Sequence, residues 1–405
     1  MSRTLVDSGI EWIGKIPEDW DIVKVNKLFF RRKEVNQEDN PTVLSLARSG
    51  VKIRDISTNE GQLADSYDNY HRVYKGDLML NPMDLISGAN CSMSEVEGVI
   101  SPAYVNLAKK EDCNSKYYDY FFKTQYWVNA MFIHGKGVSF DNRWTMNAET
   151  IMDYKIPVPS VEEQTKIANY LDDKCSKIDR VIKDNNKEIE LLEEYKKNYI
   201  SNLVSDGRKI KLKYIFNKIG SGTTPNSSNP KLYGSDVFWI QSGDINGSVI
   251  YNTSKKVTFE AVNSNSTLKI YRNPFIVIAM YGGSIGNSSI SKIDACTNQA
   301  CCVLSETNEN LEYIFYSIKS LVNNWLSNSE GGTQPNINRE KITNSYIFLP
   351  ERNIQNLIVE RANYFCKKID KVIEYRKKII EKLEEYKKSL IYEVVTGKKE
   401  VWYGN

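Results

Sequence analysis

Histidine is nearly missing from this 405-residue chain, which contains only His71 and His134. Imidazole is the commonest metal ligand and the usual group for acid–base catalysis near neutral pH. The shortage argues against a metalloenzyme and against a histidine-based catalyst. The sequence therefore predicts no metal site.

Paired cysteines are also lacking. The chain has seven cysteines, an odd number, and no Cys-x-x-Cys pair occurs among them. A disulfide framework normally uses an even number of cysteines at regular spacings. Free thiols in a reducing cytosol are the better interpretation.

Long hydrophobic runs are absent as well. The longest, around Phe275 to Tyr281, is far too short to cross a bilayer, and Met1 to Asp7 contains no secretory apolar segment. These features predict a soluble, cytoplasmic protein with no membrane partner. Its net charge of only +3, from 54 basic and 51 acidic residues, does not by itself indicate a nucleic-acid binder.

The most prominent feature of the sequence is an internal repeat. Residues 156–205 align with residues 347–396 without a gap, and 21 of 50 positions are identical. The shared residues include the run Leu192 to Lys197, which matches Leu383 to Lys388. Charged helices resemble one another by composition, but one register that also aligns proline, glutamine and cysteine indicates duplication.

Both copies have the pattern of long amphipathic helices. Apolar residues recur at steps of three, four and seven on an otherwise charged segment, which predicts that the two stripes pack against each other. Ser160 is the expected N-cap of the first helix, with Glu163 completing a capping box. Gly207 and Gly397 follow the last apolar positions and indicate where the helices stop.

The segments between the helices are rich in short β-type runs punctuated by Gly, Asn, Ser and Pro. Short helices are expected around Tyr117 to Phe132 and Leu311 to Asn328. The predicted fold class is α+β: two α/β globules separated by two long helices, with a pseudo-twofold internal repeat. The predicted boundaries are 1–155, 156–207, 208–346 and 347–405. Two similar but non-identical globules suit a ligand with two asymmetric halves, and DNA is the obvious one.

Three segments resemble the specificity (S, HsdS) subunits of Type I restriction–modification systems. They are Asp7 to Trp20, the helix-leading stretch Ile156 to Ala168, and Gly331 to Asn338. The resemblance covers essentially the whole chain, including domain order. One departure is Phe348 to Gln355, which lacks the Pro-x-Pro and Glu-Gln of the first copy. This difference puts in doubt whether both ends of the chain dock a partner subunit equally well.

The resemblance implies that each globule is a target-recognition domain reading one half of a bipartite site in double-stranded DNA. The two helical regions would form an antiparallel coiled coil and dock two modification (M) subunits. Those subunits methylate adenine N6 with S-adenosylmethionine. Restriction (R) subunits, if present, add ATP- and Mg-dependent translocation and cleavage. The chain itself is expected to hold no cofactor.

Catalytic motifs are missing. Asn81 to Asp84 lacks the second proline and the aromatic residue of an adenine methyltransferase loop, and a turn is the better interpretation. Gly282 to Gly286 is an isolated glycine cluster without the acidic residue of a dinucleotide site. The sequence therefore predicts a chain without catalytic residues.

Base readout needs polar or basic side chains on rigid supports. The polar loops of the two globules supply the candidate DNA-binding residues, although an ordinary solvated loop remains the alternative for each. The candidates are Arg48, Ser49, Lys52, Arg54, Lys136, Asn142, Arg143, Ser221, Thr223, Thr224, Gln241, Ser242, Asp244, Gln334, Asn336 and Asn338.

The coiled-coil seam is predicted from the apolar stripe. Its residues are Ile178, Ile182, Asn185, Ile189, Leu192, Ile369, Ile373, Arg376, Ile380 and Leu383. Asn185 and Arg376 occupy matching positions, and a polar seam residue can set register. We hypothesise that role for the pair; unchanged helix pairing after replacing both with Leu would contradict it.

The C-terminal segment after Gly397 resembles the one after Gly207, so the tail is expected to complete the first globule. Two other functional classes stay open at this point. One is a coiled-coil scaffold or adaptor without DNA recognition, and the other is a stand-alone nuclease or methyltransferase.

Overall fold

The computed structural model describes residues 3–57, 64–83, 85, 91–137, 144–327 and 337–401. The chain forms two compact units, the first made of Met1–Asn185 with Lys378–Asn405 and the second of Asn186–Lys377. The first unit therefore combines the beginning and the end of the chain.

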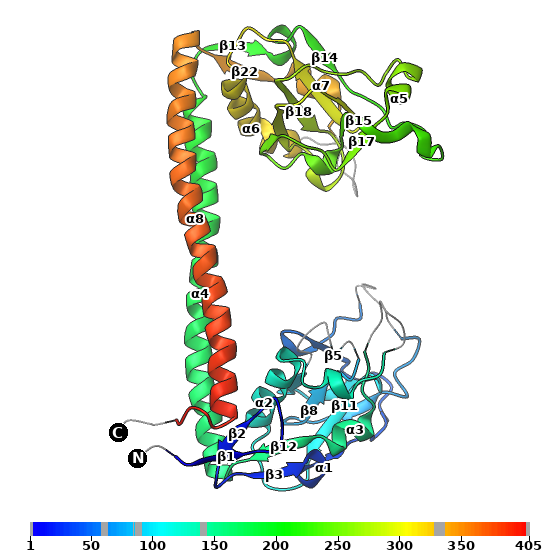
Figure 1. Cartoon of the computed structure of the whole chain (residues 1–405), viewed down its shortest axis with the longest axis vertical. Helices are drawn as coiled ribbons and strands as arrows, with labels where there is room; N and C mark the ends of the chain where they lie inside the picture. The colour runs from blue at the N-terminus through cyan, green and yellow to red at the C-terminus, as the bar shows by residue number, and fades with distance from the viewer. Residues whose placement is uncertain are drawn as a thin grey trace. The chain divides into compact units, whose positions relative to one another are not determined.

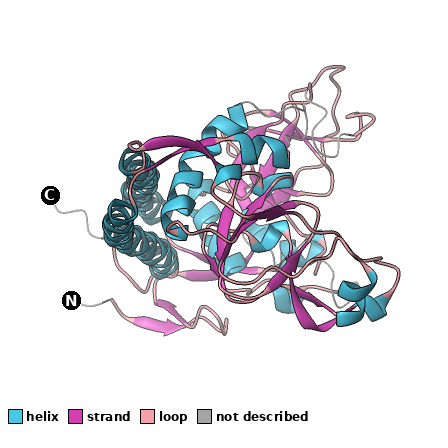
Figure 2. Ribbon diagram, turned by 90° about the horizontal axis from the view of Figure 1, so that it is seen from above, coloured by secondary structure: helices cyan, strands magenta, loops and turns pink. Residues whose placement is uncertain are grey.

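Two long helices, α4 (Val161–Leu203) and α8 (Arg352–Val395), are the duplicated segments. They contain 43 and 44 residues and lie side by side (Figure 1, Figure 2). The residue ranges show that one part of each helix belongs to the first unit and the other part to the second. The expectation of two long helices is confirmed.

Ion pairs establish the direction of the helix pairing in each unit. In the second unit, Glu188 pairs with Arg376 and Lys196 pairs with Asp370, each at 2.6 Å. In the first unit, Asp179 pairs with Lys387 at 2.6 Å, and Ile167 lines the same hollow as Val394. Residue numbers rise along α4 as they fall along α8, so the helices are antiparallel.

All ten predicted seam residues are shielded from solvent. Ile178, Asn185, Ile189 and Ile373 are buried, and the other six are half-buried. The Asn185 Nδ2 group donates to the Val181 carbonyl at 2.8 Å, whereas Arg376 reaches across to Glu188. The role of Asn185 and Arg376 in register stays a prediction.

In its described residues, the first unit contains short strands and three α-helices before α4. In chain order they are β1 (Leu5–Asp7), β2 (Lys15–Pro17), β3 (Asp21–Lys24), α1 (Val25–Leu28), β4 (Phe29–Arg31), β5 (Leu44–Ala47), β6 (Gly50–Ile53), β7 (His71–Val73), β8 (Leu78–Leu80), β9 (Cys91–Met93), β10 (Gly98–Ile100), β11 (Val105–Lys109), α2 (Ser115–Trp127), the 3-10 helix η1 (Phe132–His134), α3 (Ala148–Asp153) and β12 (Lys155–Val158). The central sheet has the order β4-β11-β8-β9, and its neighbours are antiparallel.

The second unit contains two larger sheets. Its elements are β13 (Arg208–Lys211), η2 (Leu212–Tyr214), β14 (Lys218–Gly220), η3 (Pro230–Leu232), β15 (Tyr233–Ile240), η4 (Ser242–Asp244), β16 (Val249–Ile250), β17 (Lys255–Val257), α5 (Phe259–Ser264), β18 (Phe275–Ala279), η5 (Gly282–Ser284), β19 (Ser288–Ser291), β20 (Ala295–Thr297), β21 (Cys301–Ser305), α6 (Leu311–Ser327), α7 (Arg339–Asn344) and β22 (Tyr346–Leu349). The sheets have the orders β14-β21-β18-β19-β16 and β17-β15-β20.

One apolar helix anchors the core of each unit. On α2, Tyr117 and Phe121 are fully buried, and on α6, Tyr313 and Ile318 are fully buried. Helix α2 starts two residues earlier than expected, because Asn114 accepts the N–H groups of Lys116 and Tyr117 and so caps it. It ends at Trp127, two residues before Asn129, whose φ of 55° does not continue a right-handed helix.

The C-terminal part of α8 packs into the core of the first unit, and Val401, beyond Gly397, packs against the same core. Tyr392 donates to the Trp12 carbonyl at 2.6 Å, and Tyr117 donates to the Val395 carbonyl at 2.9 Å. Gly397 has a φ of 70°, and a Cβ there would lie 2.3 Å from Pro17 Cδ. The turn after α8 therefore requires glycine on both counts.

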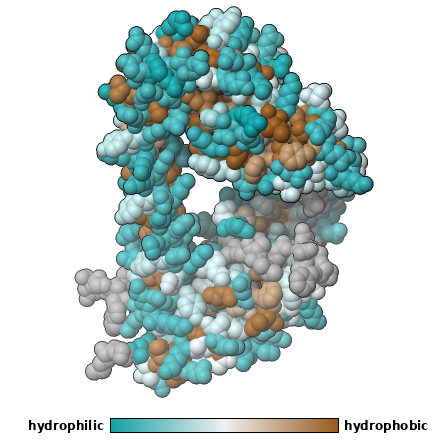
Figure 3. All heavy atoms as spheres, turned by 45° about the horizontal axis from the view of Figure 1, so that its top comes forward, coloured by the Kyte–Doolittle hydropathy of each residue, from teal (hydrophilic) through white to brown (hydrophobic). Residues whose placement is uncertain are grey.

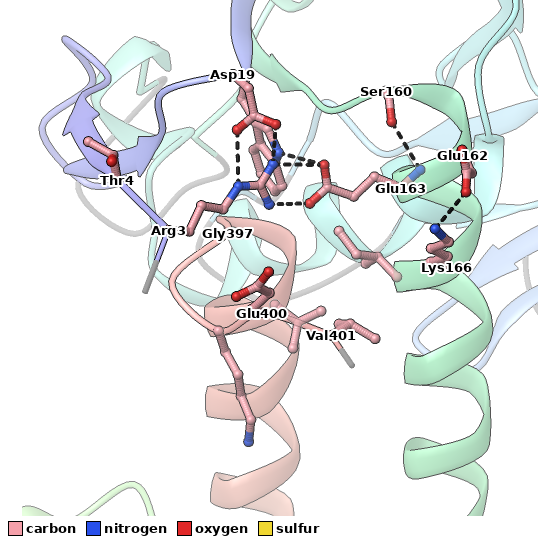
Figure 4. Close-up of a pocket in the computed structure, with 14 residues that line it drawn as sticks. Arg3, Thr4, Asp19, Ser160, Glu162, Glu163, Lys166, Gly397, Glu400 and Val401 are labelled. Atoms are coloured by element: carbon pink, nitrogen blue, oxygen red, sulfur yellow. Dashed lines mark hydrogen bonds and ion pairs between the residues drawn. The ribbon is translucent and has the colours of Figure 1, made fainter. Parts of the chain in front are cut away.

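An ionic cluster lies next to this closure, in a hollow of about 820 Å³. Arg3 lies between Asp19 and Glu163 (Figure 4), with its Nη2 donating to Glu163 Oε2 at 3.0 Å. Trp20 Nε1 also donates to Glu163 Oε2, at 2.9 Å. Ser160 does cap α4, by accepting the Glu163 N–H at 3.2 Å, but the Glu163 carboxylate bonds Arg3 and Trp20 instead of closing a capping box.

The position of Glu163 is occupied differently at the start of the second long helix. The residue that matches Glu163 in the repeat is Ile354, which is 41% exposed. Glu163 accepts hydrogen bonds from Arg3 and Trp20, which belong to the N-terminal part of the first unit. The carboxylate therefore stabilises the closure of the first unit.

Among the described residues, no helix combines the length and apolar character needed to cross a membrane.

We predict that Glu163→Ala lowers the free energy of unfolding of the first unit by about 1–3 kcal/mol, because Arg3 and Trp20 lose a charged acceptor. Hydrogen exchange should show less protection at residues 5–24. Ile354→Ala is the matched control and should change stability by less than about 0.5 kcal/mol. Unchanged protection at residues 5–24 in Glu163→Ala would contradict the closing role.

Candidate nucleic-acid interface

Two parallel strands of the second unit bring distant loops to one edge. Strands β15 and β20 pair in parallel, and Ile240 lies opposite Thr297. Because both strands end there, the segments that follow leave from the same sheet edge. The Asn298 N–H donates to the Ile240 carbonyl at 3.0 Å and ties the two segments together. Ligands commonly bind at the carboxyl ends of parallel strands.

The glycine-rich segment after β14 packs on this edge. Thr224 Oγ1 donates to Gln299 Oε1 at 2.7 Å, and the Gly222 N–H donates to the Asn298 carbonyl at 3.3 Å. A Cβ on Gly222 would lie 1.7 Å from the Thr297 carbonyl oxygen, so only glycine allows this approach. Trp239 Nε1 also donates to the Thr223 carbonyl, at 3.3 Å.

The start of α7 joins the same group of loops. The Ile337 N–H donates to the Met280 carbonyl at 3.0 Å, and the Met280 N–H donates to the Ala300 carbonyl at 2.8 Å. We call the combined set the unit 2 loop cluster. It consists of Ser221–Pro225, Gln241–Asp244, Asn298–Ala300 and Ile337–Asn338.

The structure therefore brings seven of the sequence candidates into one place. They are Ser221, Thr223, Thr224, Gln241, Ser242, Asp244 and Asn338. Sequence reasoning missed Gln299, which is exposed beside Thr224. The sequence feature that could have identified Gln299 is its position two residues after the strand Ala295–Thr297. No local sequence pattern indicates that this side chain faces the loop of Thr224.

Some of these side chains are engaged in holding the loops. Asp244 accepts the Gln241 N–H at 2.9 Å and the Ser254 N–H at 3.0 Å. Asn338 Oδ1 caps α7 by accepting the Lys341 N–H at 2.7 Å. Asp244 thus fixes the backbone that carries its neighbours.

The candidates of the first unit lie mainly on one hairpin. Arg48 and Ser49 form the two-residue turn between β5 and β6 and are exposed, as is Lys52 on β6. Arg54 follows β6 and is half-buried; it lines a hollow of about 440 Å³ together with Tyr70 and Tyr104. The hairpin therefore presents cationic side chains on two hydrogen-bonded antiparallel strands.

Lys136 is exposed and pairs through its backbone with Thr145. Four candidates lie outside the described residues: Asn142, Arg143, Gln334 and Asn336. All sixteen remain predictions as DNA contacts.

The chemistry of the second unit's cysteines favours packing over catalysis. Burial raises the pKa of the Cys296, Cys301 and Cys302 thiols to about 12. A thiol with such a pKa is protonated near neutral pH, and the thiolate is the nucleophile.

The molecular surface that Figure 3 shows is mostly hydrophilic, with hydrophobic atoms in separate patches.

Comparison with solved structures defines the class of fold. A chain of a solved type I R-M system, described for its complex assembly and conformational transition, matches with a TM-score of 0.73 and 13% identity, covering 95% of this chain and 100% of that chain. The HsdS subunit from Thermoanaerobacter tengcongensis matches with a TM-score of 0.52 and 13% identity, covering 95% and 98%. The fold is therefore that of Type I specificity subunits.

The family model described as "Type I restriction modification DNA specificity domain" matches residues 99–191 and 205–385. This chain belongs to that family, so it is a non-catalytic specificity subunit of the Type I class. The MjaIX specificity subunit of Methanocaldococcus jannaschii is 23% identical over 407 residues, covering 91% of this chain and 90% of that protein. The putative MjaX specificity subunit of the same organism is 24% identical over 259 residues, covering 58% and 57%.

We predict that Thr224→Ala and Gln299→Ala reduce discrimination between the correct and a singly changed base pair in one half of the DNA site. A base contact made by such a side chain contributes about 1–3 kcal/mol of discrimination. Competition binding by the assembled complex measures the effect.

Asn263→Ala, on the exposed face of α5, is the control and should leave discrimination unchanged. If both loop-cluster variants discriminate like the unaltered complex, the unit 2 loop cluster is not the reading surface.

Proposed function

We propose that this chain reads a bipartite site in double-stranded DNA through two target-recognition domains, residues 1–155 and 208–346. Two M subunits dock on the helical segments 156–207 and 347–405. The observation that carries the proposal is a duplicated unit whose polar loops differ between copies. The first copy presents Arg48, Ser49 and Lys52, and the second presents Thr224, Gln299 and Asn338.

Different loop chemistry on a repeated frame is what two different half-sites require. A scaffold that only joins proteins has no such need, so the adaptor alternative is weaker. Residues 1–155 carry 19 basic and 22 acidic residues, which predicts weak phosphate binding by the first domain alone. Partner subunits would then supply much of the non-specific DNA affinity.

In this proposal the M subunits hold S-adenosylmethionine and methylate adenine N6. R subunits, where present, bind ATP and Mg. The complex acts in the cytoplasm, where it meets DNA.

Methylome sequencing of cells that express this chain with its M subunit tests the proposal. The expected result is a single motif made of two specific half-sites separated by a non-specific spacer, with modified adenines in the halves. Omission of this chain should abolish the modification. A continuous motif, or modification that persists without the chain, would overturn the proposal.

A repeated surface on the helices supports docking of two identical partners. In the first unit, the Asp179–Lys387 ion pair places Val181 and Tyr386 at one level of the helix pair. In the second unit, the equivalent Asp370–Lys196 ion pair does the same for Val372 and Tyr195.

These four apolar residues are exposed to similar degrees. The exposed fractions are 45% for Val181 and 41% for Val372, and 55% for Tyr195 and 53% for Tyr386. Other exposed apolar residues of α8 are not repeated: Tyr364, which is 64% exposed, matches the charged Asp173. The Val–Tyr pair is thus the apolar feature that a partner meeting both units would find twice, and exposed aromatics are typical interface anchors.

We predict that Tyr195→Glu and Tyr386→Glu each release one M subunit and that the double variant releases both. A buried charge at an aromatic anchor should weaken binding by about tenfold or more. Native mass spectrometry of the reconstituted complex gives the stoichiometry.

Tyr364→Glu is the matched control, because Tyr364 is exposed but not duplicated. Two M subunits still bound to the double variant would place the docking surface elsewhere.

A further inference from the structure

Each unit joins its recognition domain to a long helix through a ladder of polar contacts that is repeated between the units. We call this ladder the helix joint. It connects α2 to α4 in the first unit and α6 to α8 in the second. Its residues are Asn114, Lys116, Tyr120, Gln164, Thr165 and Asp172 in the first unit, and Asn310, Glu312, Tyr316, Gln355, Asn356 and Asn363 in the second.

The first rung is a buried glutamine. Gln164 accepts the Asn114 N–H at 2.8 Å and donates to the Pro159 carbonyl at 2.9 Å. Gln355 accepts the Asn310 N–H at 2.9 Å and donates to the Pro350 carbonyl at 2.9 Å. Both glutamines are at most 1% exposed, so the two copies share the same buried geometry.

The second rung also repeats. The asparagine that caps the shorter helix turns its Nδ2 group to the long helix. Asn114 donates to Thr165 Oγ1 at 3.2 Å, and Asn310 donates to Asn356 Oδ1 at 2.8 Å. Each asparagine thus fixes the start of the shorter helix and its attachment at the same time.

The third rung keeps its geometry but changes its charges. In the first unit, Asp172 accepts the Tyr120 hydroxyl at 2.8 Å and pairs with Lys116 at 2.7 Å.

In the second unit, Asn363 Oδ1 accepts the Tyr316 hydroxyl at 2.5 Å, and its Nδ2 donates to Glu312 Oε2 at 3.1 Å. A Lys–Asp pair is therefore replaced by a Glu–Asn pair at equivalent positions.

We infer that the third rung is a positioning and matching element. It holds each recognition domain in one orientation on its long helix and makes each joint specific for its own domain. An exchanged pairing would place Glu312 opposite Asp172, which are like charges, and Lys116 opposite Asn363, which offers no carboxylate. Repulsion between like charges is a general means of excluding the wrong partner.

Orientation matters because base readout depends on donors and acceptors held within a fraction of an ångström. A domain that rocks on its helix spreads its loops over several registers and discriminates bases less well, although its own core is unchanged. This inference rests on the proposed reading of two half-sites.

The test copies the chemistry of one joint into the other. Asn363→Asp places a carboxylate beside Glu312, and adding Glu312→Lys recreates the Lys–Asp pair of the first unit. We expect Asn363→Asp to lower discrimination by about threefold to tenfold in the half-site that the Thr224 and Gln299 variants weaken. The other half-site should be unaffected, and the Asn363→Asp/Glu312→Lys pair should restore discrimination to within about twofold.

The measurement is the ratio of methylation rates of two duplexes in the complex with the M subunit. One carries the intact site and the other a single changed base pair in one half-site. Thermal unfolding of the same variants separates positioning from stability, because a merely structural defect would lower discrimination in step with the unfolding midpoint.

Unchanged discrimination in Asn363→Asp, or a loss that Glu312→Lys does not repair, overturns the inference. If the unaltered complex shows no bipartite site, the proposed function itself fails, and that outcome is distinct. The complementary pair Asp172→Asn/Lys116→Glu should likewise preserve reading by the first domain, whereas Lys116→Glu alone should impair it.

Discussion

Antiparallel pairing of α4 with α8 is the constraint on which the remaining structure depends. Each helix contributes to both units, and the first unit is therefore not a continuous stretch of chain: it begins at residue 1 but also needs residues 378–405. The ion pairs Asp179–Lys387 and Lys196–Asp370 are the same pair in two copies of the repeat. The two copies of one amphipathic helix thus pack their apolar stripes against each other. The part of the helix pair in each unit carries one globule.

Differences between the copies are as informative as the likeness. Glu163 holds Arg3 of the N-terminal segment, whereas the matching position at the start of the second long helix is occupied by Ile354. The joints keep buried Gln164 and Gln355 but exchange Asp172 for Asn363. The geometry shared by the two joints holds both globules on their helices in the same way. The changed charges make the two joints different, as the proposed recognition of two unlike half-sites requires.

The unit 2 loop cluster depends on supporting residues as much as on exposed ones. Asp244 and Asn338, both expected to contact DNA, have acceptor oxygens that bind backbone N–H groups. Gly222 lets its loop approach Thr297, and this approach brings Thr224 to Gln299. A polar residue in a loop can therefore serve recognition by fixing its neighbour, and sequence alone does not separate the two roles.

The sequence by itself determined the repeat, the two long helices, their apolar seam and the family, because helix periodicity and capping are local and the repeat is visible as identity. Only the tertiary structure decided that Gln299 faces Thr224, since that contact follows from the parallel pairing of β15 with β20 between distant segments. It also decided that Glu163 closes the first unit rather than a capping box, because its partners Arg3 and Trp20 lie far away in the chain. Local periodicity predicts that two apolar stripes pack together, but it does not predict polar contacts between distant loops.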